Sequence, residues 1–281
     1  MKPQTRRKTS LPILLAYVVI GFGCLLMLAP FWFMFVFATH SNTEILSVPP
    51  PVWFGTHFFA NWVDLLGRLP AFWNNIGWSV YVAIATTIAN LFFCSLAGYA
   101  FAMYDFRYKK LLFGFIMSTM MLPAFVGLIP TALIMSWLGW MDQPKALIVP
   151  GMVGAFGIFL MRQYIESAIP KELIDAARID GCSEFGIYVR VVAPLITPAM
   201  GTLGLLTFIG SWNNFMGPLI VMRSMENFTI PLALRALQGT GQTPYGAISA
   251  GSAVAVLPLL ILFMLASKRL ISGLTAGAVK A

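Results

Sequence analysis

The strongest constraint on the fold of this chain is a series of apolar runs, each long enough to cross a bilayer as a helix. A bilayer core about 30 Å thick takes roughly 20 helical residues. Six runs are long enough, at about residues 11–38, 76–103, 111–137, 146–164, 195–222 and 247–267. The sequence therefore predicts an all-α integral membrane protein, with one transmembrane domain of six helices over residues 11–267.

The composition supports a membrane protein and argues against other classes. Hydrophobic residues make up 59% of the 281 residues and charged residues 10%, against about 25% charged residues in soluble domains. The net charge is +8, but the cations do not gather with stacking aromatics, so we expect no nucleic-acid binding. Three Cys and two His residues, widely separated, indicate neither a disulfide framework nor a metal site.

The first apolar run follows a basic N-terminus at residues 1–10 and could be a signal peptide. It exceeds the usual signal core of about 7–15 residues and has no clear cleavage site, so a retained span is favoured. Residues 57–66, with several aromatics, are typical of a helix lying in the membrane interface.

The Lys and Arg residues predict the orientation, because cytoplasmic loops retain an excess of cations. Only four of the 18 lie on one side of the predicted spans: Arg68, Lys145, Arg223 and Arg235. The other side carries both termini, including the tail 268–281, and the loop 165–194. We therefore expect this side to be cytoplasmic.

No enzyme site is evident in the predicted spans. Every Asp and Glu lies in a loop or at a span end, whereas ion-coupled transporters commonly carry an ionisable group at membrane depth. The serines within spans have no His partner for nucleophilic catalysis. The chain also lacks a Walker-type Gly-Lys-Ser/Thr loop and cannot itself hydrolyse ATP. The simplest inference is that energy arrives from another polypeptide through a cytoplasmic loop.

Trp212, Asn213 and Asn214 in the fifth span are the candidates for a substrate pathway. Amides and aromatic rings commonly hold uncharged sugars, and the following Gly-Pro loosens the helix. Hydrogen bonding between helices is an equally good explanation for either Asn. For Asn90, Thr86 and Thr87 ordinary packing is favoured. The small residues Gly151, Gly154 and Gly157, and Ala247, Gly251 and Ala255, are interpreted as helix-packing positions.

The charged segment 169–181 lies between long apolar runs and forms the polar centre of the chain. Pro170 suits the first turn of a helix and Gly181 suits the position just past its end, so we expect one short helix over residues 170–180. Such a short helix is marginal alone and must dock on something. Ala176 and Ala177 allow another backbone to approach closely, with polar groups around that contact. Residues 182–193 continue as an amphipathic segment.

The spacing of Asp175-Ala176-Ala177, Gly181, Val191 and Ala193-Pro194 resembles the loop signature of ABC importer permeases. Where that signature has Glu, Ile and Leu, this chain has Asp175, Val191 and Ala193. In that family the loop is a coupling helix held in a groove of a cytoplasmic ATPase. The resemblance implies a coupling role for Glu172, Asp175, Ala176, Ala177, Asp180 and Gly181. The alternative is a surface helix that docks on nothing outside the chain.

Other stretches resemble the carbohydrate-importer branch of this family, in particular the smaller permease subunit of maltose-type systems. They are residues 97–102, 212–215 with 218–219, 229–232 and, most specifically, 273–280. The resemblance implies a type I ABC importer permease fold. It also implies that the tail, with Thr275, Gly277 and Lys280, reaches the ATPase dimer interface.

The resemblance further implies a heterodimer with a second permease subunit, a dimer of cytoplasmic ATPases that holds ATP and Mg, and an extracytoplasmic solute-binding protein. This chain would then bind no cofactor of its own. It would reside as a multi-pass protein in a bacterial or archaeal cytoplasmic membrane. The expected function is import of a sugar. The alternatives are import of a glycerol phosphate, polyol or amino acid by the same mechanism, and a stand-alone secondary transporter or channel.

Overall fold

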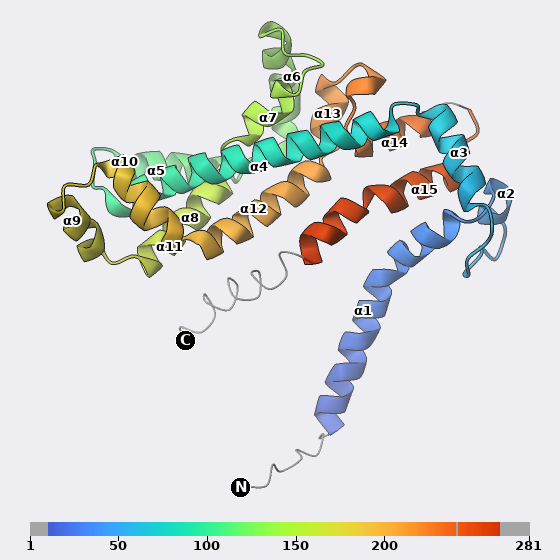
Figure 1. Ribbon diagram of the computed structural model, residues 1–281, viewed down its shortest axis with the longest axis horizontal. Helices are drawn as coiled ribbons and strands as arrows, with labels where there is room; N and C mark the ends of the chain where they lie inside the picture. Colours follow the sequence, from blue (N-terminus) through green and yellow to red (C-terminus); the bar gives the residue numbers. More distant parts are fainter. Residues whose placement is uncertain (1–10, 240, 265–281) are drawn as a thin grey trace. The chain divides into compact units, whose positions relative to one another are not determined.

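The computed structural model describes residues 11–239 and 241–264, and every regular element in these residues is helical (Figure 1). The contacts between Cα atoms divide the chain into two compact units. Of the described residues, the first contains 11–69, 237–239 and 241–255, and the second contains 70–236 and 256–264. Each unit is described separately below.

The first unit is built from α1 (Leu11–Phe37), α2 (Asn42–Ile45), α3 (Phe58–Arg68), the 3₁₀ turn η4 (Leu237–Gly239) and α15 (Tyr245–Ala255). Ala38, Ala250 and Ala253 form a small buried cluster under the rings of Phe58 and Trp62. The predicted packing positions Ala247, Gly251 and Ala255 are buried. The predicted helix over residues 57–66 is present as α3.

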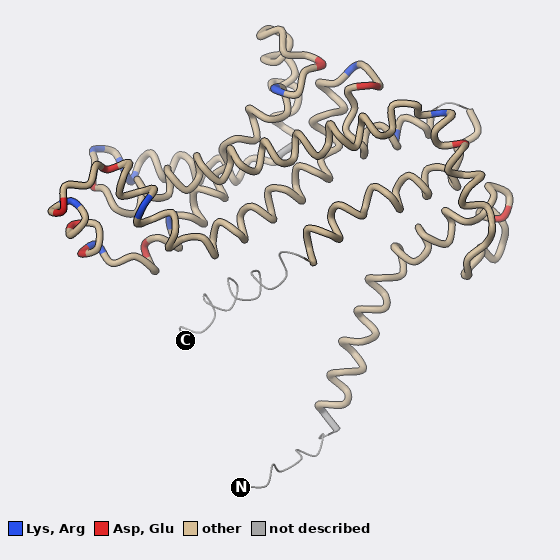
Figure 2. Tube along the Cα trace, in the orientation of Figure 1, with Lys and Arg blue, Asp and Glu red and all other residues tan. Residues whose placement is uncertain are grey.

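The second unit contains the remaining elements. They are α4 (Phe72–Met103), α5 (Lys109–Thr119), η1 (Ala124–Gly127), α6 (Leu128–Trp137), α7 (Lys145–Gly151), α8 (Ala155–Ala168), α9 (Lys171–Ile179), α10 (Glu184–Ile187), the π-helical η2 (Tyr188–Val192), α11 (Ala193–Leu195), α12 (Thr197–Trp212), α13 (Met216–Val221), η3 (Met225–Asn227) and α14 (Ile230–Ala236). The long helix α4 carries no charged residue, whereas charged residues gather around α9 and α10 (Figure 2).

Four helices among the described residues are long and apolar enough to cross a membrane: Ile13–Phe37, Phe72–Met103, Lys145–Ala168 and Tyr245–Met264. A fifth candidate is the pair Glu184–Leu195 and Thr197–Trp212, which is bent by 81° between its two parts. Four of the predicted spans thus coincide with such a helix, and the predicted span 195–222 overlaps the bent pair as far as Trp212.

The predicted span 111–137 is not one continuous helix. Helix α5 ends at Thr119, and the chain resumes helical structure with η1 at Ala124 and α6 at Leu128. Pro123 lies in the gap with an extended ψ of 131°. Proline has no N–H to donate and disfavours a helical conformation in the residue before it, so the helix ends here.

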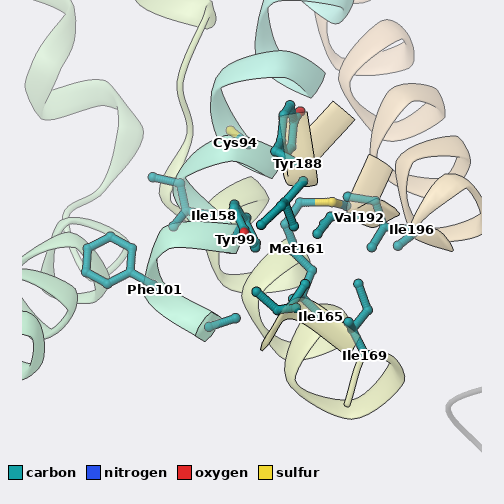
Figure 3. Close-up of a cluster of buried hydrophobic side chains, with 14 of the residues drawn as sticks. Cys94, Tyr99, Phe101, Ile158, Met161, Ile165, Ile169, Tyr188, Val192 and Ile196 are labelled. Atoms are coloured by element: carbon teal, nitrogen blue, oxygen red, sulfur yellow. The ribbon is translucent and has the colours of Figure 1, made fainter. Parts of the chain in front are cut away.

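Close contact between α4 and α8 forms the centre of the second unit (Figure 3). A Cβ built on Gly157 would lie 2.7 Å from the Cys94 Sγ, and one on Gly98 would lie 2.5 Å from the Met161 Cβ. Only glycine allows the two helices to approach this closely. The sequence predicts packing positions at Gly151, Gly154 and Gly157. Gly151 and Gly157 lie tightly against α4, and a Cβ built on Gly154 would lie at an ordinary contact distance of 3.8 Å from Asn90 Nδ2.

Asn90 links three helices of the second unit. Its Nδ2 donates to the Gly151 carbonyl at 3.0 Å, and its Oδ1 accepts from the Thr207 hydroxyl at 3.3 Å. A buried amide is stabilised when both its donor and its acceptor have partners. This geometry explains Asn90 as a packing residue.

Asp142 fixes the loop that joins α13 to α14. Its carboxylate accepts hydrogen bonds from the Arg223 and Ser224 backbone N–H groups at 3.0 and 3.1 Å, from the Ser224 hydroxyl and from Asn227. Partial burial opposes ionisation, but these hydrogen bonds together hold the pKa of Asp142 below its usual value. On the other side of the loop, Asn75 Nδ2 donates to the Met225 and Phe228 carbonyls. The loop is therefore held in one conformation from two sides.

Candidate functional site

The candidate site is α9 with the segment that follows it. The helix begins at Lys171, directly after Pro170, and its last residue is Ile179. Gly181 has a φ of +77°, which L side chains rarely adopt, and the Cys182 N–H donates to the Ala177 carbonyl at 3.1 Å to close the helix. The predicted helix over residues 170–180 is confirmed.

The inner face of α9 packs on the second unit's own core. Ile174 is 2% exposed and Ala177 is 9% exposed, and both belong to the cluster that contains Ile165, Ile169 and Ile187. Sequence reasoning treated Ala176 and Ala177 alike, as positions for close approach by another protein. In the structure Ala177 faces inward, so only Ala176 offers its side chain to a partner.

The outer face of α9 carries apolar side chains that no part of the described chain covers. Leu173, Ala176 and Ile179 are exposed, and their spacing of three residues places them on one side of the helix. Ile179 is 87% exposed, an unusual state for a large aliphatic side chain. The exposed acidic residues Glu172, Asp175 and Asp180 surround this strip. The strip Leu173–Ala176–Ile179 is called the outer strip below.

Arg178 ties α9 to the segment that follows it and to the end of α4. Its guanidinium donates to the Asp175 carboxylate at 2.9 Å and to the Glu184 carboxylate at 2.8 Å, and its Cζ lies 5.5 Å from the centre of the Tyr104 ring. The Tyr104 hydroxyl in turn donates to Glu184. Tyr104 is the residue directly after α4, so this polar group joins α9, α10 and α4.

The charges of this group reinforce one another. The hydrogen bond from Arg178, and then that from Tyr104, lowers the pKa of Glu184. Glu184 raises the pKa of Arg178 by the same hydrogen bond, although burial opposes it. Partial burial, followed by the hydrogen bond to Glu184, raises the pKa of Tyr104. Near neutral pH Arg178 is therefore cationic, Glu184 anionic and Tyr104 protonated.

A second link to α4 lies directly after α10, at Tyr188. The Tyr188 hydroxyl is 2.7 Å from the Ser95 Oγ, and its ring centre lies 5.9 Å from that of Tyr99, so the whole side chain packs against α4 (Figure 3). Tyr188 begins the π-helical turn η2, in which the Ala193 N–H bonds back to the Tyr188 carbonyl. Pro194 has no N–H to donate to the Arg190 carbonyl, so the regular α-helical ladder is interrupted here. The segment that follows α9 is therefore packed directly on α4.

The predicted substrate residues do not form one wall. Trp212 is 3% exposed and its ring stacks on Phe208 at 5.9 Å, so it faces the fold. Asn214 lies just before α13, and its Oδ1 accepts from the N–H of Gly217 in the first turn of that helix at 3.1 Å. Asn213 and Asn214 are both exposed in the break between α12 and α13, so of the three only Trp212 is buried.

The remaining predicted site residues, Thr275, Gly277 and Lys280, lie outside the described residues. Within the described residues no group of three or more His, Cys, Asp or Glu side chains could hold a metal ion. Sequence reasoning missed the roles of Tyr104, Ser95 and Tyr188. An Arg and a Glu six residues apart around a turn hinted at the Arg178–Glu184 pair, but nothing in the sequence pointed to their partners on α4.

Residues 94–275 match the family described as "Binding-protein-dependent transport system inner membrane component". The chain belongs to this family. The resemblance noted from the sequence is thus confirmed, and the protein is a transport permease of the inner membrane that crosses the bilayer more than once. As a family member it works with a binding protein.

Named relatives cover almost the whole permease. It is 34% identical over 279 residues to the arabinooligosaccharides transport system permease protein AraQ of Halalkalibacterium halodurans, which covers 98% of this chain and 99% of AraQ. It is 30% identical over 279 residues to the lactose transport system permease protein LacG of Rhizobium radiobacter, with the same coverage.

A solved structure shares the fold of this permease. It is described as the crystal structure of a bacterial ABC transporter involved in the import of the acidic polysaccharide alginate. The match has a TM-score of 0.79 at 23% identity and covers 95% of this chain and 99% of that chain. The predicted all-α fold of a type I ABC importer permease is confirmed.

Proposed function

We propose that this permease forms half of the translocation pathway of an ATP-driven sugar importer, and that α9 couples the pathway to an ATPase. The observation that carries the coupling proposal is the two-sided character of α9. Its inner face, through Ile174 and Ala177, is fixed to the permease core, whereas its outer strip is apolar and uncovered. An apolar strip on a short cytoplasmic helix is suited to a groove in a partner protein.

The polar group around Arg178 connects α9 to α4, so docking of a partner on α9 acts on α4 as well. A helix as short as α9 is marginally stable alone, so without contacts to the rest of the permease it would unfold or shift by itself when a partner moved it. Arg178, Glu184 and Tyr104 connect α9 to the end of α4, and Tyr188 connects the next turn to Ser95 within α4. Displacement of α9 is therefore passed to α4 and not absorbed in the loop.

The complete importer that we propose contains four further subunits: a second permease subunit as heterodimer partner, two cytoplasmic ATPases that form a dimer, and an extracytoplasmic binding protein. ATP and Mg are held by the ATPases, and this chain binds no cofactor. Both termini and α9 lie in the cytoplasm, and Thr275, Gly277 and Lys280 contact the ATPases. Glu172, Asp175, Asp180 and Gly181 frame the outer strip where the ATPase docks.

A sugar is the proposed solute because AraQ and LacG are named for the transport of arabinooligosaccharides and lactose. Asn213, exposed at the helix break, supplies an amide of the kind that holds sugar hydroxyl groups. Asn214 is exposed beside it and also accepts from the Gly217 N–H, whereas the buried Trp212 stacks on Phe208.

The test of the coupling proposal places a large cation in the outer strip. Ala176→Arg adds a charged side chain on the exposed face and leaves the buried face untouched, so it should abolish sugar uptake and co-purification of the ATPase without lowering the amount of permease in the membrane. The matched control is Ala60→Arg, at an exposed Ala of α3. Normal uptake in the Ala176→Arg variant would refute the coupling role.

The solute is tested separately, in cells that produce the unaltered importer. Labelled arabinooligosaccharide, lactose and glycerol 3-phosphate are offered in turn, and uptake is measured with and without excess unlabelled competitor. Preferential uptake of a neutral sugar supports the proposal. Uptake of glycerol 3-phosphate alone contradicts the sugar assignment but leaves the coupling proposal intact.

A further inference from the structure

A pocket of about 340 Å³ opens in the second unit where α4 ends and α5 begins, and none of its lining residues belongs to α9. This volume is within the range of about 300–1,000 Å³ that is typical of small-ligand sites. Its lining residues fall into two groups, apolar (Phe101, Phe113, Gly114) and charged (Asp105, Lys109, Lys110, Arg162). The proposed coupling role does not use this pocket.

The charged side of the pocket is cationic. Lys109 Nζ donates to the Tyr104 carbonyl at 2.8 Å and lies 3.3 Å from Asp105, so its ammonium is held in place. Arg162 is held likewise, because its guanidinium donates twice to Glu166 and its Cζ lies 4.1 Å from the centre of the Phe113 ring. Lys110 is exposed and leaves the lining with an excess of positive charge.

The apolar side of the pocket includes α5, a helix with exposed apolar side chains. Phe101 and Phe113 lie with their ring centres 5.4 Å apart and form the wall. Elsewhere on α5, Leu111 and Phe115 are both 69% exposed, so this helix offers apolar surface outside the pocket as well. A ligand that fits must therefore carry an anionic group next to a long apolar part.

The position of the pocket also favours a ligand with an anionic group and a long apolar part. Helix α4, a candidate membrane span, ends at Met103, and Asp105, Lys109 and Lys110 follow at once. The pocket thus lies where a span leaves the apolar core and enters the headgroup region. Basic pockets between membrane helices at this depth suit the phosphate of an anionic lipid, since cations there attract anionic headgroups.

We propose that this pocket is a binding site for an anionic phospholipid, with the phosphate at Lys109, Lys110 and Arg162 and an acyl chain along Phe113 and α5. Arg162, oriented by Phe113 and Glu166, supplies a planar donor group to the phosphate oxygens. Lys110 adds attraction without being needed for any contact within the fold.

The test measures lipid binding to the full-length permease, purified in detergent with the subunits that accompany it. Short-chain phosphatidylglycerol and phosphatidylcholine are titrated, and the bound lipid is counted by native mass spectrometry. We expect phosphatidylglycerol to bind more tightly. One cation near the membrane surface contributes about fivefold to affinity, so Lys110→Gln should weaken phosphatidylglycerol binding about fivefold and have little effect on phosphatidylcholine.

Two further variants sharpen the result. Lys109→Gln combined with Lys110→Gln should weaken phosphatidylglycerol binding about thirtyfold. Lys145→Gln is the matched control, because Lys145 is also an exposed cation at the start of a helix but lies outside the pocket, and it should leave binding unchanged. Thermal unfolding of each variant shows whether loss of the Lys109 contact to Tyr104 disturbs the fold. If the double variant is disturbed, the single variant Lys110→Gln, which keeps the Lys109 contact, is the deciding test of lipid binding.

Three outcomes would overturn the proposal. Equal binding of the two lipids, or unchanged phosphatidylglycerol binding in the Lys110→Gln variant, would show that the cations do not select an anionic headgroup. Displacement of the lipid by an equal concentration of inorganic phosphate would assign the pocket to a free anion. A photocrosslinker in place of Leu111 that captures another polypeptide and no lipid would show that a protein covers the site.

Discussion

Replacement of Ile179 by Ala should weaken ATPase binding without altering the stability of the permease. The Ile179 side chain is 87% exposed, so the permease itself gains little from it. Burial of this side chain in a partner groove would remove its apolar surface from water. The change to Ala deletes three carbon atoms at about 0.8 kcal/mol each, or about 2.4 kcal/mol for complete burial. The expected loss of affinity is about fiftyfold.

Ile174→Ala is the comparison, because Ile174 lies on the opposite face of the same helix and is 2% exposed. Truncation of a buried Ile costs about 2–5 kcal/mol of folding stability. This variant should therefore lower the midpoint of thermal unfolding, whereas Ile179→Ala should leave it unchanged.

The assay is the binding of the purified ATPase to the permease in lipid nanodiscs, recorded alongside thermal unfolding of both variants. The reasoning is refuted if Ile179→Ala binds the ATPase as tightly as the unaltered permease does. It is also refuted if Ile179→Ala lowers the unfolding midpoint as much as Ile174→Ala, because the two faces of α9 would then not have separate roles.

Two further predictions concern the packing of α4 and the group around Glu184. Gly157→Val should destabilise the permease by about 1–3 kcal/mol, because the new side chain meets Cys94, whereas Gly21→Val, at a helical position with open space, should not change thermal unfolding. The depressed pKa of Glu184 means that its ion pair stabilises the fold above the ordinary value of 4.5 and that this contribution is lost as the pH falls through the lowered pKa. The unfolding midpoints of the unaltered permease and Glu184→Gln should thus differ at neutral pH and converge at acidic pH; a constant difference would contradict the assignment.

Local signals in the sequence were enough to predict α9 and the packing positions. Pro170 and Gly181 act on the backbone beside them, through a fixed φ and through tolerance of a positive φ, so the ends of the helix follow from neighbouring residues alone. Gly157 could likewise be predicted as a packing position, because a residue without a side chain allows another helix to approach closely. Such features need no knowledge of the rest of the fold.

Which side chains point toward the core could not be predicted from such local signals. Ala176 and Ala177 are the same residue type at adjacent positions, and only the location of the core shows that Ala177 is buried. The aromatic ring of Trp212 is of the kind that binds sugars, but in the structure it is buried and stacks on the ring of Phe208. The contact of Tyr104 with Glu184 joins residues 80 positions apart, which no local pattern encodes.

The central claim is that the outer strip of α9 is held by a separate nucleotide-hydrolysing subunit. The most direct measurement is photocrosslinking in intact membranes, with the photoreactive amino acid placed at Ala176, at Ile179 and, as a control on the exposed face of α3, at Ala60. The account predicts that the first two positions capture an ATPase and that the third does not. It is contradicted if Ala176 and Ile179 capture only lipid or no ATPase at all.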